Sequence, residues 1–526
     1  MKTVSIFNHV IGPVMRGPSS SHTAAAYHIG AMARSMLGAA PSKAAITFDP
    51  AGSYATCYRP QGADLAFAAG LMGWPITDDR FPDALRAAAA SGLEIAFAVE
   101  TLDQADHPNA VDVRLASADG RELHARANSV GGGAVEFVRL GGWPVRFTGD
   151  AHEIAVEVEP AAQGRALELL LGDGAMIGQP ECQGRAGVSL VCVRRRSPLP
   201  PEAQRRLAAL PGVRQVWAGQ PIFFVEKGEP LFASAKEMVL LAAQRGLSLG
   251  RLALEYEAAL LGLSQDEVAA EAARRFGVMQ QSVLRGLESP GPRMQLLRPS
   301  ARGIYEAEAA GRVAVGGIHT RAAARALAVM HVNSSMGVVC AAPTGGSAGV
   351  IPAVLVTLVE EKGLEAPQAA IALLAAGAVG VIVATRATFA AEVAGCQVEI
   401  GAAGAMAAAA VVEAARGTAE QAAQAAAIAF QNSMGSVCDL VQGIVEIPCH
   451  TRNAAAASGA MLCADLVLGG YANPIGLDET IDAVYAVGRM LPDELRCTAL
   501  GGLAATPSAR AMKRLRPEGA GPGETP

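Results

Sequence analysis

The second half of this chain is dominated by small apolar residues that few charges interrupt. The stretches from Val338 to Val359 and from Ala369 to Thr385 carry no charged side chain and consist largely of Ala, Val, Leu and Gly. Small side chains allow helices to approach closely, and apolar residues on every face of a helix are typical of burial. We therefore predict a large, Ala-rich helical region from about residue 232 to 515.

Uncharged stretches are also typical of membrane-spanning helices, which need about 20 consecutive apolar residues. Here the first stretch is broken by Pro343, Gly345, Gly346 and Pro352, and the second is short for a span. The segment Met1–His9 lacks the apolar run of a signal peptide. We expect buried helices, no membrane partner and a cytoplasmic protein.

Composition and charge exclude further classes of protein. The chain has 526 residues, of which 51% are hydrophobic and 17% are charged, so several folded domains are expected and general disorder is excluded. There are 43 Lys and Arg against 49 Asp and Glu, and the longest basic run is Arg194–Arg196, so we expect no nucleic acid partner. Nine cysteines, an odd number without an export signal, favour free or metal-bound thiols over a disulfide framework.

Three regions of different texture follow one another and predict a multidomain fold. Residues 1–148 mix short apolar runs with turns, which indicates an N-terminal α/β domain. Residues 232–515 are predicted as a mostly α-helical catalytic domain, and residues 516–526 as a flexible tail. Between the two domains, residues 150–228 are predicted as a small ferredoxin-like βαββαβ module, with strands at His152–Val158, 174–186, Gly187–Val193 and Val213–Trp217 and helices at Ala161–Leu171 and Pro201–Leu210.

Two helix starts and two loops can be located within the helical region. Ser264 precedes Glu267, and Thr418 precedes Gln421, at the spacing of a capping box. The Gly and Pro residues at 343–349 and 443–448 predict loops between buried helices. Backbone in such loops can reach a ligand.

Two segments rich in hydroxyl groups or glycine could hold an anion. The run Ser19-Ser20-Ser21-His22-Thr23 precedes an Ala-rich helix, and its side chains can either cap that helix or bind a carboxylate together with backbone N–H groups. The loop Thr344-Gly345-Gly346-Ser347 lacks the Lys of a phosphate-binding Walker loop. The residues by themselves leave helix capping and carboxylate binding both open.

Three cysteines stand beside turn-forming residues, where a thiol can leave the helix packing. Cys396, Cys438 and Cys449 are 42 and 11 residues apart. These separations do not fit the short spacings of zinc fingers or bacterial ferredoxins. Spacing alone therefore leaves both metal ligands and buried structural cysteines open.

Five motifs, taken together, resemble those of a known family. They are IGPVMRGPSSSHT at 11–23, VNSSMGVVCAAPTGGSAG at 332–349, GCQVEIG at 395–401, CDLVQGIVEIPCHTRN at 438–453 and GGLAATP at 501–507. In this order they make the chain similar, over nearly its whole length, to the iron–sulfur-dependent L-serine dehydratases, or L-serine ammonia-lyases. The resemblance implies a serine dehydratase β part, an ACT-like regulatory module and an α part fused in one chain.

The resemblance also implies a cofactor and a reaction. Cys396, Cys438 and Cys449 would hold a [4Fe–4S] cluster with one iron open, and no pyridoxal phosphate would be needed. The enzyme would eliminate water from L-serine or a related β-hydroxy amino acid and release a 2-oxo acid and ammonia. We expect a small amino acid as substrate, an amino-acid effector at the ACT-like module and a homo-oligomer. Cys340 would be a packed thiol.

The other site residues follow from the same resemblance. His22 would be catalytic, and the substrate would be bound by Ser19, Ser20, Ser21, Thr23, Thr344, Gly345, Gly346, Ser347, Arg386, Arg452 and Asn453. Three positions depart from the family pattern, because Gln61, Ala63 and Arg386 stand where His, Thr and Asn are expected. Two alternatives follow: a lyase for a different, dicarboxylic hydroxy amino acid, or a catalytically silent amino-acid-binding protein.

Overall fold

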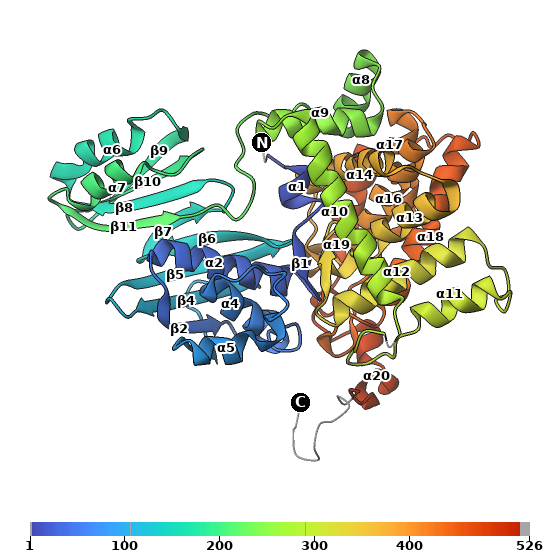
Figure 1. The fold of residues 1–526 in the computed structure, drawn as a ribbon, viewed down its shortest axis with the longest axis horizontal. Coiled ribbons are helices and arrows are strands. Elements are labelled where there is room, and N and C mark those ends of the chain that lie inside the picture. Colours follow the sequence, from blue (N-terminus) through green and yellow to red (C-terminus); the bar gives the residue numbers. More distant parts are fainter. Residues whose placement is uncertain (1–2, 106, 290, 516–526) are drawn as a thin grey trace.

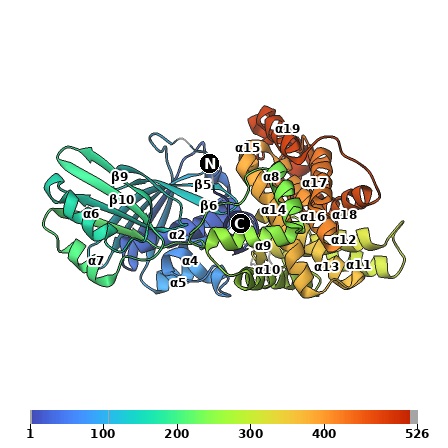
Figure 2. The same cartoon turned by 90° about the horizontal axis from the view of Figure 1, so that it is seen from above.

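The computed structural model describes residues 3–105, 107–289 and 291–515 of the chain. Two β-sheets with their helices lie at one end of the molecule, and a large helical region forms the other end (Figures 1 and 2). An N-terminal α/β region and a mostly helical C-terminal region were both predicted, and the structure has both. The tail predicted at residues 516–526 lies outside the described residues.

The first sheet has six strands in the order β3-β2-β4-β5-β6-β7. β2 and β3 are parallel, with Ile46 opposite Phe97, and the other neighbouring strands are antiparallel. Helices α2 and α4 lie beside it (Figure 1). They pack closely on each other, because Gly70 of α4 has no side chain and a Cβ there would lie 2.5 Å from the Tyr27 carbonyl oxygen of α2. The bounds are β2 Pro41–Phe48, β3 Glu94–Val99, β4 Ala110–Ser117, β5 Glu122–Gly131, β6 Ala134–Leu140, β7 Trp143–Phe147, α2 Ala25–Leu37, α3 Tyr54–Cys57, α4 Ala63–Met72 and α5 Ala84–Ala90.

The second sheet has four antiparallel strands in the order β11-β8-β10-β9. Its elements follow one another as βαββαβ, as the alternation of apolar residues predicted. Ile154, Val156 and Val193 from the strands and Leu170 and Leu207 from the helices belong to one buried cluster. The bounds are β8 His152–Val158, α6 Gln163–Leu171, β9 Met176–Arg185, β10 Val188–Arg195, α7 Pro201–Ala208 and β11 Val213–Gly219.

Two helices, α14 and α16, form the centre of the helical region and pack against each other and against most of their neighbours. The capping boxes at Ser264 and Thr418 are present at the starts of α10 and α17, as predicted. The bounds are α8 Ala235–Arg245, α9 Leu249–Leu261, α10 Gln265–Gly286, α11 Ala301–Ala309, α12 Ile318–Ser334, α13 Val350–Lys362, α14 Ala366–Arg386, α15 Ala391–Ala394, α16 Ile400–Ala414, α17 Ala419–Ser433, α18 Cys449–Leu468, α19 Leu477–Met490 and α20 Pro507–Ala511.

Two segments of the helical region are long and apolar enough to cross a membrane, Ala366–Arg386 and Cys396–Ala414. Within them, 83% and 89% of the most apolar window is buried inside the protein. Their apolar surface is therefore covered by neighbouring helices, and both segments are core helices, as the sequence predicted for the first of them.

The N-terminal segment ties the two ends of the molecule together. The short helix α1, Ile6–His9, packs on α14, where a Cβ on Gly377 would lie 2.5 Å from Ile6 Cγ2. The strand β1, Val14–Arg16, then pairs antiparallel with β12, Val338–Cys340, which comes from the helical region (Figure 1). Residues Ile6–His9 and Val14–Arg16 thus pack with the helical region, ahead of the first sheet in the sequence.

The carboxylate of Glu257 on α9 holds α1 in place. It accepts hydrogen bonds from the Ser5 hydroxyl at 2.5 Å and from the backbone N–H groups of Ile6 at 2.8 Å and Phe7 at 2.9 Å. Glu257 is fully buried. It therefore satisfies N–H groups at the start of α1 that have no partner within the helix.

Replacing Glu257 by Ala is expected to lower the free energy of unfolding by about 3 kcal/mol or more, since each buried donor left without an acceptor costs about 1–3 kcal/mol. The shift of the urea midpoint, followed by circular dichroism, measures this. Glu255→Ala is the matched control, because Glu255 forms a partly exposed ion pair with Arg245, a kind worth about 1 kcal/mol at most. Equal midpoints for the two variants would contradict the assigned role of Glu257.

Candidate active site

The serine-rich run forms a single π-helical turn, Ser20–Ala24, immediately before α2. Ser19 caps this turn, because its hydroxyl accepts a hydrogen bond from the His22 N–H at 3.2 Å. The Thr23 hydroxyl donates to the Gln61 carbonyl oxygen at 2.7 Å and accepts from the Ser19 N–H. Helix capping, one of the two alternatives left open by the sequence, is therefore realised by Ser19, and Thr23 is engaged with the backbone.

His22 lies at the centre of a group of hydroxyls. Its Nδ1 is 3.2 Å from Ser19 Oγ and 3.1 Å from Ser21 Oγ, and its Nε2 is 2.6 Å from Ser53 Oγ. The Ser21 hydroxyl donates to a carboxylate oxygen of Glu392 at 2.9 Å. Burial lowers the pKa of His22, and the negative charge of Glu392 opposes this in part. The imidazole is therefore neutral at neutral pH and able to accept a proton.

The glycine loop from the helical region closes on the serine-rich turn. The Gly345 N–H donates to Ser20 Oγ at 3.2 Å, and a Cβ on Gly345 would lie 2.9 Å from the Pro18 carbonyl oxygen. Thr344 and Ser347 share a hydrogen bond of 3.0 Å between their hydroxyls. Two segments more than 300 residues apart thus meet with hydroxyls and N–H groups, which are the donors that a carboxylate requires.

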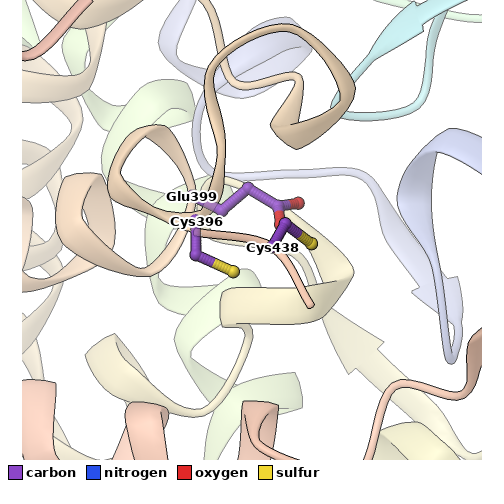
Figure 3. A group of neighbouring side chains, drawn as sticks. All are labelled: Cys396, Glu399 and Cys438. Carbon is purple, nitrogen blue, oxygen red and sulfur yellow. The ribbon is translucent and has the colours of Figure 1, made fainter. Parts of the chain in front are cut away.

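Three side chains of the helical region converge on one point beside this loop. Ligand atoms of Cys396, Glu399 and Cys438 all lie within 4.8 Å of one another, and Figure 3 shows their side chains pointing toward a common space. Glu399 also approaches the glycine loop, since a Cβ on Gly346 would lie 3.5 Å from its carboxylate. Sulfur and carboxylate ligands at such distances can hold a metal ion.

The thiols of this group change one another's pKa values. The pKa of Cys396 is lowered by a hydrogen bond from Cys438 and by the Arg452 guanidinium. The hydrogen bonds with Cys396 and Cys497, together with burial, raise the pKa of Cys438 well above its usual value. Burial and the charges of Cys396 and Glu399 do the same for Cys449 at the start of α18. Cys396 is therefore the thiol of this group whose pKa is lowered, while those of Cys438 and Cys449 are raised.

Arg452 and Asn453 support the thiol group from α18. The Arg452 guanidinium pairs with Asp439 at 2.9 Å and donates to the Val437 carbonyl oxygen at 2.7 Å. The Asn453 amide donates to the carbonyl oxygens of Gly346 and Cys449, both at 2.8 Å. Asn453 therefore links the glycine loop directly to a predicted cluster cysteine.

Cys497 joins this group, although no motif in the sequence pointed to it. Its N–H donates to the Cys438 carbonyl oxygen at 2.9 Å, and the Cys438 N–H donates to Leu495. The thiols of Cys438 and Cys497 are hydrogen-bonded, which helps to raise the pKa of Cys438. A fourth thiol thus borders the three predicted cysteines.

Three further residues were not predicted for the site, namely Ser53, Glu392 and Glu399. Ser53 follows the turn after β2, and Glu392 lies in the short helix α15. Glu399 could have been found, because it stands three residues after Cys396 and its carboxylate can therefore turn back toward the cysteine. The other two carry no local signal, since their partners come from distant parts of the sequence.

The structure places Arg386 beside two acidic residues. Its guanidinium pairs with Asp482 at 2.5 Å and lies 3.6 Å from Asp478, both on α19. Arg386 therefore already has two acidic partners within the chain. Its assignment to substrate binding stays a prediction.

The other predicted positions have definite places. Gln61 is buried, and its amide donates to the Gly443 carbonyl oxygen at 3.0 Å. Ala63 begins α4. Cys340 lies in β12 as a packed thiol, and burial raises its pKa to about 11. Its charge interacts with Arg275, Arg274 and Glu271, whereas that of Cys449 interacts with Cys396, so the expectation that Cys340 is structural is kept.

The comparisons with known proteins identify the family. Residues 244–504 match the family "Serine dehydratase alpha chain". The chain is 37% identical over 284 residues to the probable L-serine dehydratase alpha chain of Bacillus subtilis (strain 168), which covers 54% of this chain and 95% of that protein. It is 36% identical over 282 residues to the L-serine dehydratase alpha chain of Peptoniphilus asaccharolyticus, covering 53% of this chain and 97% of that protein.

A separate relative extends the similarity beyond alpha chains. The probable L-serine dehydratase beta chain of Bacillus subtilis (strain 168) is 40% identical over 156 residues, which is 30% of this chain and 69% of that protein. The fold and the buried thiol group define a multidomain enzyme with a site that could hold a metal. The chain belongs to the L-serine dehydratase family.

The site geometry predicts that the metal-free protein binds Co²⁺ through thiolates. Titration under anaerobic conditions should give the sulfur-to-cobalt absorption band, because Cys396 and Cys438 converge on one point. Cys396→Ser and Cys438→Ser should each abolish most of this band. Cys340→Ser is the control and should leave the band in place, and an equal loss in all three variants would show that the ligands are assigned wrongly.

Proposed function

We propose that this chain is an L-serine ammonia-lyase, which removes water from L-serine and releases pyruvate and ammonia. The observation that carries the proposal is the meeting of the serine-rich turn, the glycine loop and the thiol group at one place. The hydroxyl and N–H groups suit the carboxylate of an amino acid, and the thiols suit a metal centre. The relatives named L-serine dehydratase support the same reaction.

The metal centre is proposed to be a [4Fe–4S] cluster held by Cys396, Cys438 and Cys449. The donor set fits such a cluster, because the three thiols are buried and their charges act on one another. When bound, an iron without a protein thiolate supplies a Lewis acid for the β-hydroxyl of serine. No pyridoxal phosphate is invoked, since this chemistry replaces a Schiff base.

The remaining roles belong to side chains and backbone of this chain. The Ser19–Thr23 turn and the Thr344–Ser347 loop would bind and orient the substrate carboxylate. Arg452 compensates the negative charge of Cys396, and Asn453 fixes the loop to the cysteine that begins α18. The neutral imidazole of His22 would take part in removing the proton from Cα.

The division of the chain into residues 1–148, 150–228 and 232–515 is proposed to separate a β-type domain, an ACT-like regulatory module and an α-type catalytic domain. A cleft of about 790 Å³ lies between the first two. Lys43, Arg114 and Glu157 line it and offer both charges that an amino-acid effector needs. Calorimetric titration of the whole chain with serine tests this proposal. If the heat of a second binding event is present in the wild type and lost in Lys43→Ala and Arg114→Ala, the effector binds in this cleft. We also propose a cytoplasmic homo-oligomer.

Anaerobically purified protein is expected to contain about four irons per chain, the number in a cubane cluster, and to release pyruvate from L-serine. Cys396→Ser, Cys438→Ser and Cys449→Ser should each lose both the iron and the activity. Iron analysis and a keto-acid assay measure these. Cys340→Ser should keep both, so iron retained in all three ligand variants would refute the cluster assignment.

The enzyme is expected to convert L-serine to its keto acid faster than 3-hydroxyaspartate, because Arg386 is paired with Asp482 and Asp478 and does not attract a second carboxylate. Arg386→Asn should change the ratio of kcat/KM for the two substrates only slightly, by less than about 0.5 kcal/mol when the ratio is expressed as a free energy, as is usual for surface substitutions. Loss of a charged hydrogen bond to the second carboxylate would instead change it by about 1.5–3 kcal/mol. A change of that size would assign Arg386 to substrate binding.

A further inference from the structure

A continuous line of hydrogen bonds crosses the site from Glu392 to Ser53. Ser21 Oγ donates to Glu392 at 2.9 Å and lies 3.1 Å from His22 Nδ1. His22 Nε2 lies 2.6 Å from Ser53 Oγ. Glu392 belongs to the helical region, four residues before Cys396, whereas the other three residues belong to the first α/β region. The line therefore exists only because the two regions pack together.

The chemistry of these groups gives the line a direction. An ionised carboxylate can only accept hydrogen bonds, so the single hydroxyl proton of Ser21 is given to Glu392. Within the Ser21–His22 hydrogen bond, Ser21 Oγ can then only accept, which places the ring proton of the neutral imidazole on Nδ1, where Ser19 Oγ at 3.2 Å is a second acceptor. Nε2 consequently presents a lone pair to Ser53 and accepts the hydroxyl proton of that residue.

Ser53 ends the line on the side of the α/β region and is partly accessible, as Glu392 is at the other end. It stands at the start of α3, where a serine normally caps the helix, but its side chain makes no such bond. Its hydroxyl is instead used by His22, which is only 1% exposed, whereas Ser53 is half-buried. Cys57, at the end of α3, lies close to the thiol group, since its charge acts on Cys497 and a Cβ on Gly443 would lie 3.3 Å from its sulfur.

Gln61 offers no alternative as a base. It occupies the position where the family resemblance implies a histidine, but an amide takes up no proton at neutral pH. Its nitrogen already donates to the Gly443 carbonyl oxygen. Another group has to accept the proton from Cα in this chain.

We propose that Ser53 is the catalytic base of this enzyme, with His22 as the acceptor of its hydroxyl proton and Ser21 and Glu392 as positioning residues. This assignment rests on the proposed L-serine dehydratase function. Ser53 Oγ takes the proton from Cα while its own proton moves to His22 Nε2. The electron pair of the broken Cα–H bond forms the Cα=Cβ bond, and the Cβ–O bond breaks with loss of hydroxide. The imidazolium returns the proton through Ser53 to the hydroxide, which gives water.

The first test needs no turnover. ¹⁵N spectra of the anaerobic whole protein, labelled at histidine and assigned with His22→Gln, should show His22 protonated at Nδ1 and not at Nε2. Glu392→Gln should weaken this preference, because a Gln amide can donate to Ser21 and reverse the line. A His22 ring protonated at Nε2 in the wild type would overturn the proposal.

The second test uses the holoenzyme and L-serine. Ser53→Ala should lower kcat by about 100-fold or more, the usual contribution of a general base, with KM and iron content close to those of the wild type. The isotope effect on kcat with 2-deutero-L-serine should rise, because proton removal becomes rate-limiting. Ser53→Thr keeps the hydroxyl and should recover part of the activity, whereas Ser91→Ala is a control at an unrelated helix end. Wild-type kcat in Ser53→Ala would overturn the proposal.

Glu392→Gln separates a positioning role from a purely structural one. Among the described residues, Glu392 is the charged group that acts on His22, and the uncharged Tyr54 ring packs edge-on against the imidazole. Loss of the carboxylate should therefore move the acid limb of kcat/KM to lower pH, with iron retained. If the acid limb of the pH profile stays at the same pH, Glu392 does not act on His22 and is not a positioning residue. A wild-type holoenzyme that releases no pyruvate would refute the proposed function. The tautomer of His22 would still test the direction of the hydrogen bonds from Glu392 to Ser53.

Discussion

The pairing of Val14–Arg16 with Val338–Cys340 is the contact on which the rest of the site depends. It joins two segments that are far apart in the sequence, and each strand leads within a few residues into a loop of the site. The serine-rich turn follows the first strand, and the glycine loop follows the second. The Gly345–Ser20 hydrogen bond then closes the two loops on each other. Without this ladder the hydroxyls and the thiols would belong to separate surfaces.

Burial of like charges is the second constraint on the site. Glu399, Cys438 and Cys449 all have raised pKa values, chiefly because of desolvation and of the thiols beside them. Arg452 is the cation that acts on this group, and Asp439 already shares it. A buried group of this kind gains stability when a positively charged metal centre occupies it, since Coulomb interactions are strong away from water. Cys396 differs from those three groups, because the hydrogen bond from Cys438 and the Arg452 guanidinium lower its pKa.

Local patterns were sufficient for much of the fold. The capping boxes at Ser264 and Thr418 involve residues three positions apart, so the sequence alone contains the whole interaction. The same holds for the alternation of apolar and polar residues in His152–Val158 and for the long apolar helix Ala366–Arg386. The three motif cysteines could also be selected, because the residues around them resemble those of a known family. These features depend on near neighbours or on recurrent motifs.

Contacts between distant segments decided the rest. Arg386 reads as a free cation in the sequence, but its partners Asp478 and Asp482 lie on α19, which only the packing of α14 brings close. Cys497 enters the thiol group through backbone pairing with Cys438. Ser53, His22 and Glu392 carry no signal as single residues. Only the folded chain brings them into one line of hydrogen bonds with a defined direction. The sequence by itself determined the long helices, the strands of the second sheet and the motif cysteines, since these depend on local periodicity and recurrent motifs. The tertiary structure decided which groups face one another, because hydrogen bonds and charges act over a few ångströms in space and not along the chain.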